Sequence, residues 1–159
     1  MFQKNYIKWL ESLTIFLLLL TIFNVFIDVM LRYVFNNSSI GLQELEWHLF
    51  SAMFLLGIAY TLQKDAHVRV DIFYANFTPK KQAWVNIVGF FSFIAPISLI
   101  IVYYGSDFAY NAYLIGEQSG DPGGLTHRFI IKSIIPLSFI LVIISGAIFT
   151  KDNYKVLKK

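Results

Sequence analysis

Hydrophobic positions occur along this chain in four long blocks, separated by short polar segments. Each block approaches or exceeds the roughly 17–25 residues that a helix needs to cross a bilayer. The blocks are continuous and rich in Leu, Ile and Phe, whereas the strands of a transmembrane barrel alternate in polarity. We therefore predict an all-α integral membrane protein with four transmembrane helices in a single membrane domain. The expected spans are residues 7–35, 42–63, 78–105 (with helix able to continue to 114) and 126–149.

Local signals indicate where these helices begin and end. Thr78 followed by Pro79 is typical of an N-cap and a first helical residue. The segment GEQSGDPGG, residues 116–124, predicts a loop before the fourth span. Pro96 and Pro136 each remove a hydrogen bond inside a helix, so we expect a kink at each. The short connections favour four antiparallel helices packed as a small bundle.

The basic residues predict the orientation of the helices. Of the 13 Lys and Arg, about ten lie at the chain ends or between the second and third spans. The positive-inside rule then places both termini and the middle connection in the cytoplasm. Four spans also require both termini on one side of the membrane. No clear small-residue cleavage site follows the first block, so we expect it to stay as a signal anchor.

Composition narrows the classes of function. Only 14% of the residues are charged, against about 25% in soluble domains. The chain has no cysteine, which removes disulfide exchange, thiolate catalysis and iron–sulfur ligation. The net charge of +3 comes from residues at membrane borders, which does not indicate nucleic-acid binding. We expect that this chain is not an enzyme and that it has no catalytic site, no metal site and no cofactor.

The first span carries a polar face. Thr21, Asn24, Asp28 and Arg32 follow one another at offsets of three, four and four residues, which places them on one side of a helix. Asp28 and Arg32 are spaced for an ion pair within the helix. Three interpretations remain open: a neutralised pair facing the bundle, a proton- or ion-coupling carboxylate, or a contact with a partner subunit.

The second span carries a similar polar face, made of Glu44, His48 and Ser51. Glu44 lies in the first turns, where the helix dipole favours negative charge. These residues either form a seam against the first or fourth span or pack against another polypeptide. His48 and His127 both lie at span ends on one side of the membrane, so a haem between them is an alternative hypothesis.

The third span carries small and polar residues at helical spacing, which would allow another helix to approach closely. This stripe consists of Asn86, Gly89, Ser92 and Pro96. In the fourth span, Lys132 lies one turn before Pro136 and is expected to extend toward the outer border.

Several segments resemble the small membrane subunit, of the DctQ or SiaQ type, of tripartite ATP-independent periplasmic (TRAP) transporters. The similar segments are LRYVFNNSSI (31–40), QELEWHLFSAMFLLGIAYTLQKDAHVRVD (43–71) and KSIIPLSFIL (132–141). The matching features are Arg32-Tyr33, the acidic Glu44, Gly57 and Ala59 inside the second span, and the exit His67-Val68-Arg69-Val70-Asp71. The tryptophan usual in the family just before the acidic residue is absent, and Leu42 stands there.

The resemblance implies an accessory role in the bacterial inner membrane. In such systems a periplasmic binding protein captures an organic acid, of the sialic acid or C4-dicarboxylate class. A large membrane subunit, of the DctM or SiaM type, carries the acid by sodium-driven symport. The small subunit is implied to be a scaffold in contact with lipid and the large subunit, without a substrate site. Candidate interface or structural residues are Asp28, Arg32, Tyr33, Glu44, Trp47, His48, Gly57, His67, Arg69, Asp71, Gly89 and Ser92.

Two finer hypotheses and two alternatives accompany this interpretation. We expect His67, Arg69 and Asp71 to fix the cytoplasmic turn. An acidic outer surface of Glu44, Glu46, Glu117 and Asp121 is a hypothetical docking site for the binding protein. The alternatives are a stand-alone proton-coupled exporter, with Asp28 as its proton site, and a haem-bearing membrane anchor of a redox complex.

Overall fold

The computed structural model describes residues 2–64 and 74–158, and this part of the chain folds into helices and their connections. The helices are α1 (Phe2–Val34), α2 (Ile40–Gln63), α4 (Pro79–Gly89), the π-helical η1 (Phe90–Ile94), α5 (Ala95–Leu114) and α6 (Phe129–Leu157). Because α4, η1 and α5 follow one another directly, they form one long helix. Four helices are thus long and apolar enough to cross a membrane, which confirms the predicted fold class.

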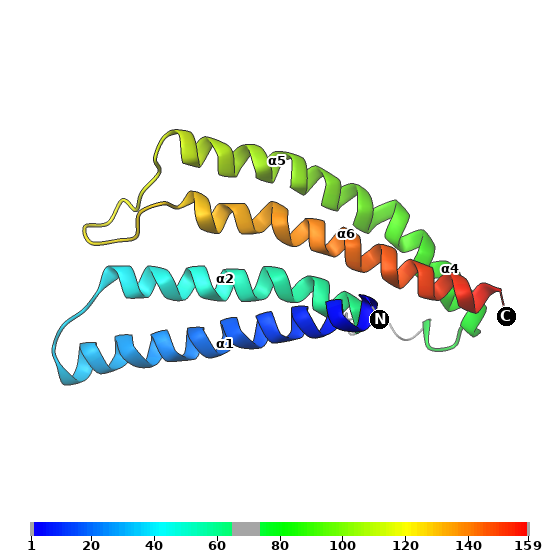
Figure 1. Cartoon of the computed structure of the whole chain (residues 1–159), viewed down its shortest axis with the longest axis horizontal. Coiled ribbons are helices and arrows are strands. Elements are labelled where there is room, and N and C mark those ends of the chain that lie inside the picture. The colour runs from blue at the N-terminus through cyan, green and yellow to red at the C-terminus, as the bar shows by residue number, and fades with distance from the viewer. Residues whose placement is uncertain (1, 65–73, 159) are drawn as a thin grey trace.

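The four long helices lie side by side in a row, in the order α1, α2, α6, α5 (Figure 1). The helices α2 and α6 are the inner members, and α1 and α5 are the edges. The expected bundle is therefore wrong, because a bundle would also bring α1 against α5. A physical reason is that lipid is as apolar as the helices, so no hydrophobic force closes the row into a bundle.

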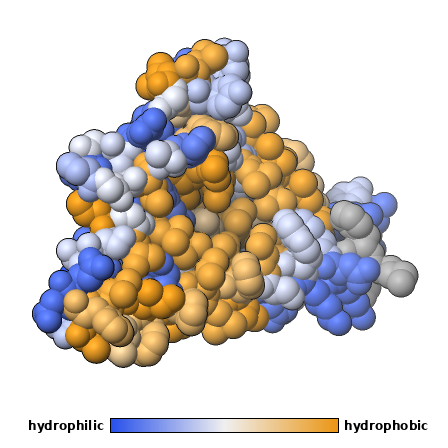
Figure 2. Space-filling model, turned by 60° about the vertical axis from the view of Figure 1, so that its left-hand side comes forward, coloured by the Kyte–Doolittle hydropathy of each residue, from blue (hydrophilic) through white to orange (hydrophobic). Residues whose placement is uncertain are grey.

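The two ends of the row differ in what they carry. Both termini lie at one end, which we call the terminal end, together with the entry to α4 (Figure 1). The connections 35–39 and 115–128 lie at the opposite end, which we call the loop end. Figure 2 shows hydrophilic residues gathered toward the ends and a broad hydrophobic surface between them. This distribution is what a bilayer requires of a protein that crosses it.

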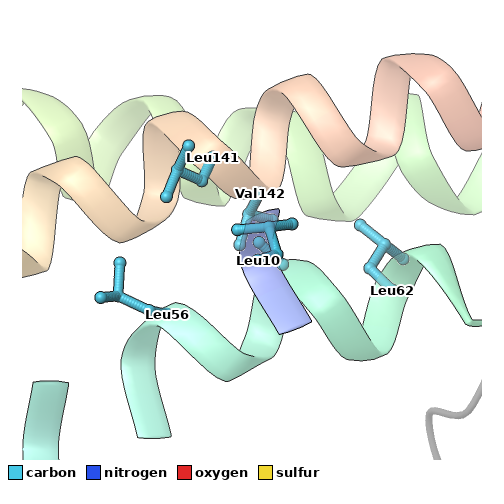
Figure 3. Close-up of a cluster of buried hydrophobic side chains, with 6 residues drawn as sticks. Leu10, Leu56, Leu62, Leu141 and Val142 are labelled. Atoms are coloured by element: carbon cyan, nitrogen blue, oxygen red, sulfur yellow. The ribbon is translucent and has the colours of Figure 1, made fainter. Parts of the chain in front are cut away.

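The main hydrophobic cluster joins three helices. It consists of Leu10, Leu56, Ala59, Leu62, Leu141 and Val142. Leu10 of α1 has no exposed surface and joins residues of α2 and α6 in this cluster (Figure 3). The first turns of α1 therefore pack on both inner helices of the row.

Polar contacts reinforce this cluster near the terminal end. The Tyr6 hydroxyl donates to the carbonyl oxygen of Leu141 at 3.0 Å and lies 3.0 Å from Ser145 Oγ. Gln63 Nε2 donates to the carbonyl oxygen of Ser145 at 2.5 Å. Side-chain hydrogen bonds between helices hold membrane proteins together at about 0.6 kcal/mol each on average. Here they attach α1 and α2 to the same turn of α6.

Two glycines allow the long third helix to approach α6 closely. The ring of Phe90 occupies the space into which a side chain on Gly146 would project. A side chain on Gly105 would lie 3.4 Å from Cδ of Pro136. Phe90 and Pro136 are both buried. These two contacts set the distance between α6 and the long third helix at two different levels along the helix axes.

The proline in the third helix has a visible structural effect. The Ala95 N–H bonds to the carbonyl oxygen of Phe90, five residues earlier, so the helix widens to a π turn just before Pro96. Proline lacks an N–H and its ring crowds the preceding turn, and a π turn is one way to relieve that crowding. Pro136, by contrast, lies inside α6, which continues through it as one helix. The predicted N-cap of this third span is confirmed, because Thr78 Oγ1 accepts from the Lys81 N–H with Pro79 at the helix start.

Candidate functional site

A single carboxylate joins three parts of the chain at the loop end. Glu44, in the second turn of α2, accepts hydrogen bonds from Ser119 Oγ at 2.5 Å and from the Leu125 N–H at 2.6 Å. It also pairs with Arg128 Nη2 at 2.9 Å. We call this set of four residues the Glu44 clasp. Because charge-assisted hydrogen bonds are stronger than neutral ones, the clasp fixes the 115–128 connection onto α2.

Glycines make room for the clasp. A side chain on Gly124 would collide with Ser119 and would lie 2.9 Å from Glu44 Oε2. A side chain on Gly41 would lie 3.2 Å from the carbonyl oxygen of Gly123, which itself has φ +84°. The glycine-rich loop that the sequence predicted therefore lies flat on the start of α2, and its glycines permit that close contact.

The end of α5 directs the connection toward α6. Gly116 has φ +60°, and the Glu117 N–H donates to the carbonyl oxygen of Ala112 at 2.9 Å, as in a Schellman C-cap. The Glu117 carboxylate then pairs with Lys132 Nζ at 2.5 Å. Lys132 Nζ also lies 3.8 Å from the ring centre of Phe108. Lys132 thus extends toward the loop end, which the charge distribution predicts to be the outer border.

A pocket of about 500 Å³ opens beside the clasp. Its walls come from α2 and from two residues of the 115–128 connection, the second of which is the N-cap of α6. It is lined by Ile40, Gln43, Glu44, Trp47, His48, Ser51, Asp121 and Arg128. The three polar residues that the sequence placed on one face of the second span therefore lie in one pocket wall, facing α6. We call this the loop-end pocket.

The polar face of α1 is divided between two contacts. Asn24 is buried and its Nδ2 donates to the carbonyl oxygen of Leu42 at 2.9 Å, which joins α1 to α2. Asp28 is also buried and forms the expected ion pair with Arg32. The second carboxylate oxygen of Asp28 is buried and has no hydrogen-bond partner among the described residues. The pair therefore links two successive turns of α1 in the half of that helix nearer the loop end.

The remaining predicted residues are dispersed. Tyr33 and Trp47 are exposed, at 75% and 73% of their surfaces. A side chain on Gly57 would lie 3.7 Å from Thr14 of α1, so Gly57 serves the contact between α1 and α2. No described atom lies within 4 Å of a side chain placed on Gly89, and Ser92 is exposed. Both therefore leave their face of the third helix open to a partner.

The segment 65–73 lies outside the described residues. The predicted roles of His67, Arg69 and Asp71 fall in that segment, so they stay predictions.

The acidic surface expected at the loop end is smaller than the sequence indicated. Glu44 and Glu117 are both engaged in the ion pairs described above, with 15% and 26% of their side chains exposed. Asp121 is exposed and Glu46 is partly exposed. The carboxylates of Glu46 and Asp121 take no part in these ion pairs, whereas those of Glu44 and Glu117 serve the fold.

The histidines do not share a cavity. His48 lines the loop-end pocket, whereas His127 lines a separate pocket with Tyr113 and Phe129. His127 has φ +60°, and its Nδ1 lies 2.7 Å from Thr126 Oγ1. This arrangement gives no support to a haem held between the two imidazoles. Within residues 2–64 and 74–158, no three His, Asp or Glu side chains group closely enough to hold a metal ion.

The partners of Glu44 were not predicted from the sequence. Ser119, Leu125 and Arg128 are distant from Glu44 in the chain, and only the fold brings them together. A signal was nevertheless present, because Arg128 and Lys132 are basic residues on the side of the membrane where acidic residues prevail. Two cations and two carboxylates at one membrane border are expected to pair.

Comparison with known proteins places this arrangement in a family. Residues 21–150 match the family model described as "Tripartite ATP-independent periplasmic transporters, DctQ component". A protein of Haemophilus influenzae, which carries the provisional name TRAP transporter small permease protein, is 30% identical over 135 residues. The alignment covers 85% of this chain and 84% of that protein. The chain therefore belongs to the DctQ component family of TRAP transporters, as a small permease subunit.

Proposed function

We propose that this chain is the scaffold subunit of a sodium-driven, binding-protein-dependent transporter for organic acids. It would hold a large membrane subunit, which carries the substrate, and would present the loop end to a periplasmic binding protein. The observation that carries the proposal is the open row of helices. Only 11% of the most apolar window of α1, and the same share of the third helix, is buried within the chain.

The unburied surface supports a partner in the membrane. The third helix leaves the small Gly89 and Ser92 open and also exposes Phe91, which is 62% exposed. Membrane helices associate through small residues and close packing, since lipid supplies no hydrophobic drive between them. The chain thus has both an accessible face and the residue types that suit a large helical partner.

The described pockets support a scaffold more than a carrier. The loop-end pocket lies at one border of the row, and a second pocket is almost entirely apolar. An organic-anion carrier is expected to aim helix N-termini or cations at a site near the membrane midplane. The charged residues described above lie instead at the loop end of their helices. The acid would accordingly be bound by the other two components, and its identity would follow from their residues.

Reconstitution tests the proposal. Proteoliposomes with the large subunit, the binding protein and this chain should take up the organic acid when a sodium gradient is applied. Omitting this chain should abolish uptake, and this chain alone should transport nothing. Uptake by this chain alone would favour the stand-alone exporter, and uptake without it would contradict the scaffold role.

Docking of the binding protein is tested by reversing the charge at the two acidic residues that are not in the ion pairs. Glu46→Lys and Asp121→Lys should weaken binding of the binding protein to the complex, more at low salt than at high salt. Asp107→Lys, on the exposed surface of α5, is the matched control. Unchanged affinity in both variants would remove the loop end from the docking surface.

A further inference from the structure

The same face of α2 contributes to two pockets of opposite character. Glu44, Ser51, Ile58 and Leu62 are separated by seven, seven and four residues, which places them on one side of the helix. The first two line the loop-end pocket, and the last two line a second pocket of about 310 Å³, which we call the inner pocket. Both pockets therefore open on one face of the row, along α2.

The inner pocket is apolar and lies toward the terminal end. Across from α2 it is walled by the π turn and α5, and α6 completes it. It is lined by Ile58, Leu62, Phe93, Ile94, Ile97, Ser98, Phe139 and Val142. The single polar residue, Ser98, is only 1% exposed. This surface fits hydrocarbon, and nothing in its lining attracts a charged group.

The loop-end pocket carries separate positive and negative groups. The guanidinium of Arg128 has five N–H donors, and Glu44 takes one nitrogen while 36% of the side chain stays exposed. His48 lies in the same wall and adds a ring nitrogen. Asp121 also lines this pocket, from the 115–128 connection, and its exposed carboxylate is not part of the clasp. A ligand with one anionic and one cationic group could place its anion by Arg128 and His48 and its cation by Asp121.

The separation of the pockets matches the length of one leaflet. From Ser51 to Leu62, α2 rises about 16 Å at roughly 1.5 Å per residue. Half of a hydrocarbon core of about 30 Å is about 15 Å. Within this stretch α2 exposes Phe54, whose ring stacks on that of Phe50 with centroids 6.4 Å apart. A chain that starts at the loop-end pocket would therefore reach the inner pocket within one leaflet.

We propose that this groove binds one phospholipid with a zwitterionic, primary-amine headgroup. Its phosphate lies by Arg128 and His48, its ammonium lies by Asp121, and one acyl chain follows α2 into the inner pocket. Assigning the lipid to the outer leaflet rests on the orientation in the proposed function, whereas the binding itself does not. The lipid would fill a concave face that the four helices leave open.

Lipid titration of the complex of this chain with its large subunit tests the headgroup. Native mass spectrometry in detergent would count bound phosphatidylethanolamine, phosphatidylcholine and phosphatidylglycerol. We expect phosphatidylethanolamine to bind about tenfold more tightly, because losing one charge-assisted contact corresponds to about that factor. Asp121→Asn should remove this preference, and Asp107→Asn should preserve it. Equal binding of the three lipids to the unsubstituted complex would overturn the proposal.

A groove-filling pair of variants tests the acyl-chain site. Ile97→Trp places a bulky ring at the inner pocket, and Ile140→Trp places one at an exposed position of α6 that does not line it. We expect the first variant to lose the tightly bound lipid and to keep the large subunit, and the second to keep both. Loss of the large subunit with retention of lipid would instead assign the groove to a helix of that subunit. Retention of both by Ile97→Trp would also overturn the proposal.

Discussion

At the scale of single residues, Glu44 has the largest structural effect at the loop end. Its two carboxylate oxygens accept from a hydroxyl, a backbone N–H and a guanidinium that belong to a distant segment. The sequence indicated an acidic residue suited to a helix start or to a partner. The structure shows that this residue is used to hold the chain's own loop.

Glu44→Gln should loosen the 115–128 connection. The substitution removes the charge that pairs with Arg128 and weakens the bond from the Leu125 N–H. A charge-assisted hydrogen bond contributes about 1.5–3 kcal/mol, so the Leu125 amide should exchange its hydrogen at least about tenfold faster. Hydrogen exchange measured by mass spectrometry checks this. Glu46→Gln is the control, and equal protection in both variants would show that the clasp does not hold the loop.

Tyr6 supplies a second test at this scale. Tyr6→Phe and Ser145→Ala each remove one side of the contact that joins α1 to α6. A double-mutant cycle should give a coupling of about 0.6–1.7 kcal/mol, as measured for hydrogen bonds within membranes. Reversible unfolding in mixed micelles provides the free energies. Tyr33→Phe, at an exposed position, should change them little, and purely additive effects at positions 6 and 145 would contradict the contact.

At the scale of helices, close approach depends on glycines that the sequence did not single out. The small-residue stripe predicted in the third span, with Gly89, faces open space. The third helix and α6 come close instead at two other glycines. Gly105 of α5 lies against Pro136 of α6, and Gly146 of α6 lies against the ring of Phe90. Ser145 and Gly146 are adjacent small residues, so the sequence did contain a sign of close packing in this span. Helical spacing alone, however, does not tell which face of a helix meets a neighbour.

Gly146→Ala should destabilise the chain, because the new Cβ would overlap the Phe90 ring. Overpacking of this kind costs about 1–3 kcal/mol. Gly89→Ala should be neutral or slightly stabilising, since its side chain meets no described atom. Thermal unfolding in detergent compares the two variants. Phe90→Leu should partly rescue Gly146→Ala, and failure to rescue would indicate that the cost arises elsewhere.

The helices themselves could be predicted because their signals are local. Hydrophobic length sets the spans, and the Thr78 cap with Pro79 sets one start. The order of the helices in the row could not be predicted, because all four are apolar around most of their circumference. Which helix lies beside which depends on a few long-range contacts, such as Gln63 with Ser145 and Glu44 with Arg128.

At the scale of the whole molecule, the row has both termini at one end and the glycine-rich loop at the other (Figure 1). The charge distribution predicts that the terminal end faces the cytoplasm. The chain has no cysteine, so single cysteines report on this orientation without background.

In intact cells, Gly120→Cys should react with a membrane-impermeant thiol reagent, and Lys158→Cys should react only after the membrane is permeabilised. Both positions are exposed, so accessibility to the reagent depends on the side of the membrane. Labelling of position 158 in intact cells, with protection of position 120, would reverse the assigned orientation.

The row consists of two hairpins, α1 with α2 and α5 with α6, that meet along the α2–α6 seam. Each hairpin is a continuous piece of chain, and the seam joins them near both ends through the Gln63–Ser145 hydrogen bond and the Glu44 clasp. The protein should therefore tolerate being made as two polypeptides, one carrying α1 and α2 and the other α4 to α6, which insert separately and find each other in the bilayer. Such complementation between fragments would mean that translation order is not needed for assembly, and that the α2–α6 seam carries the information for pairing.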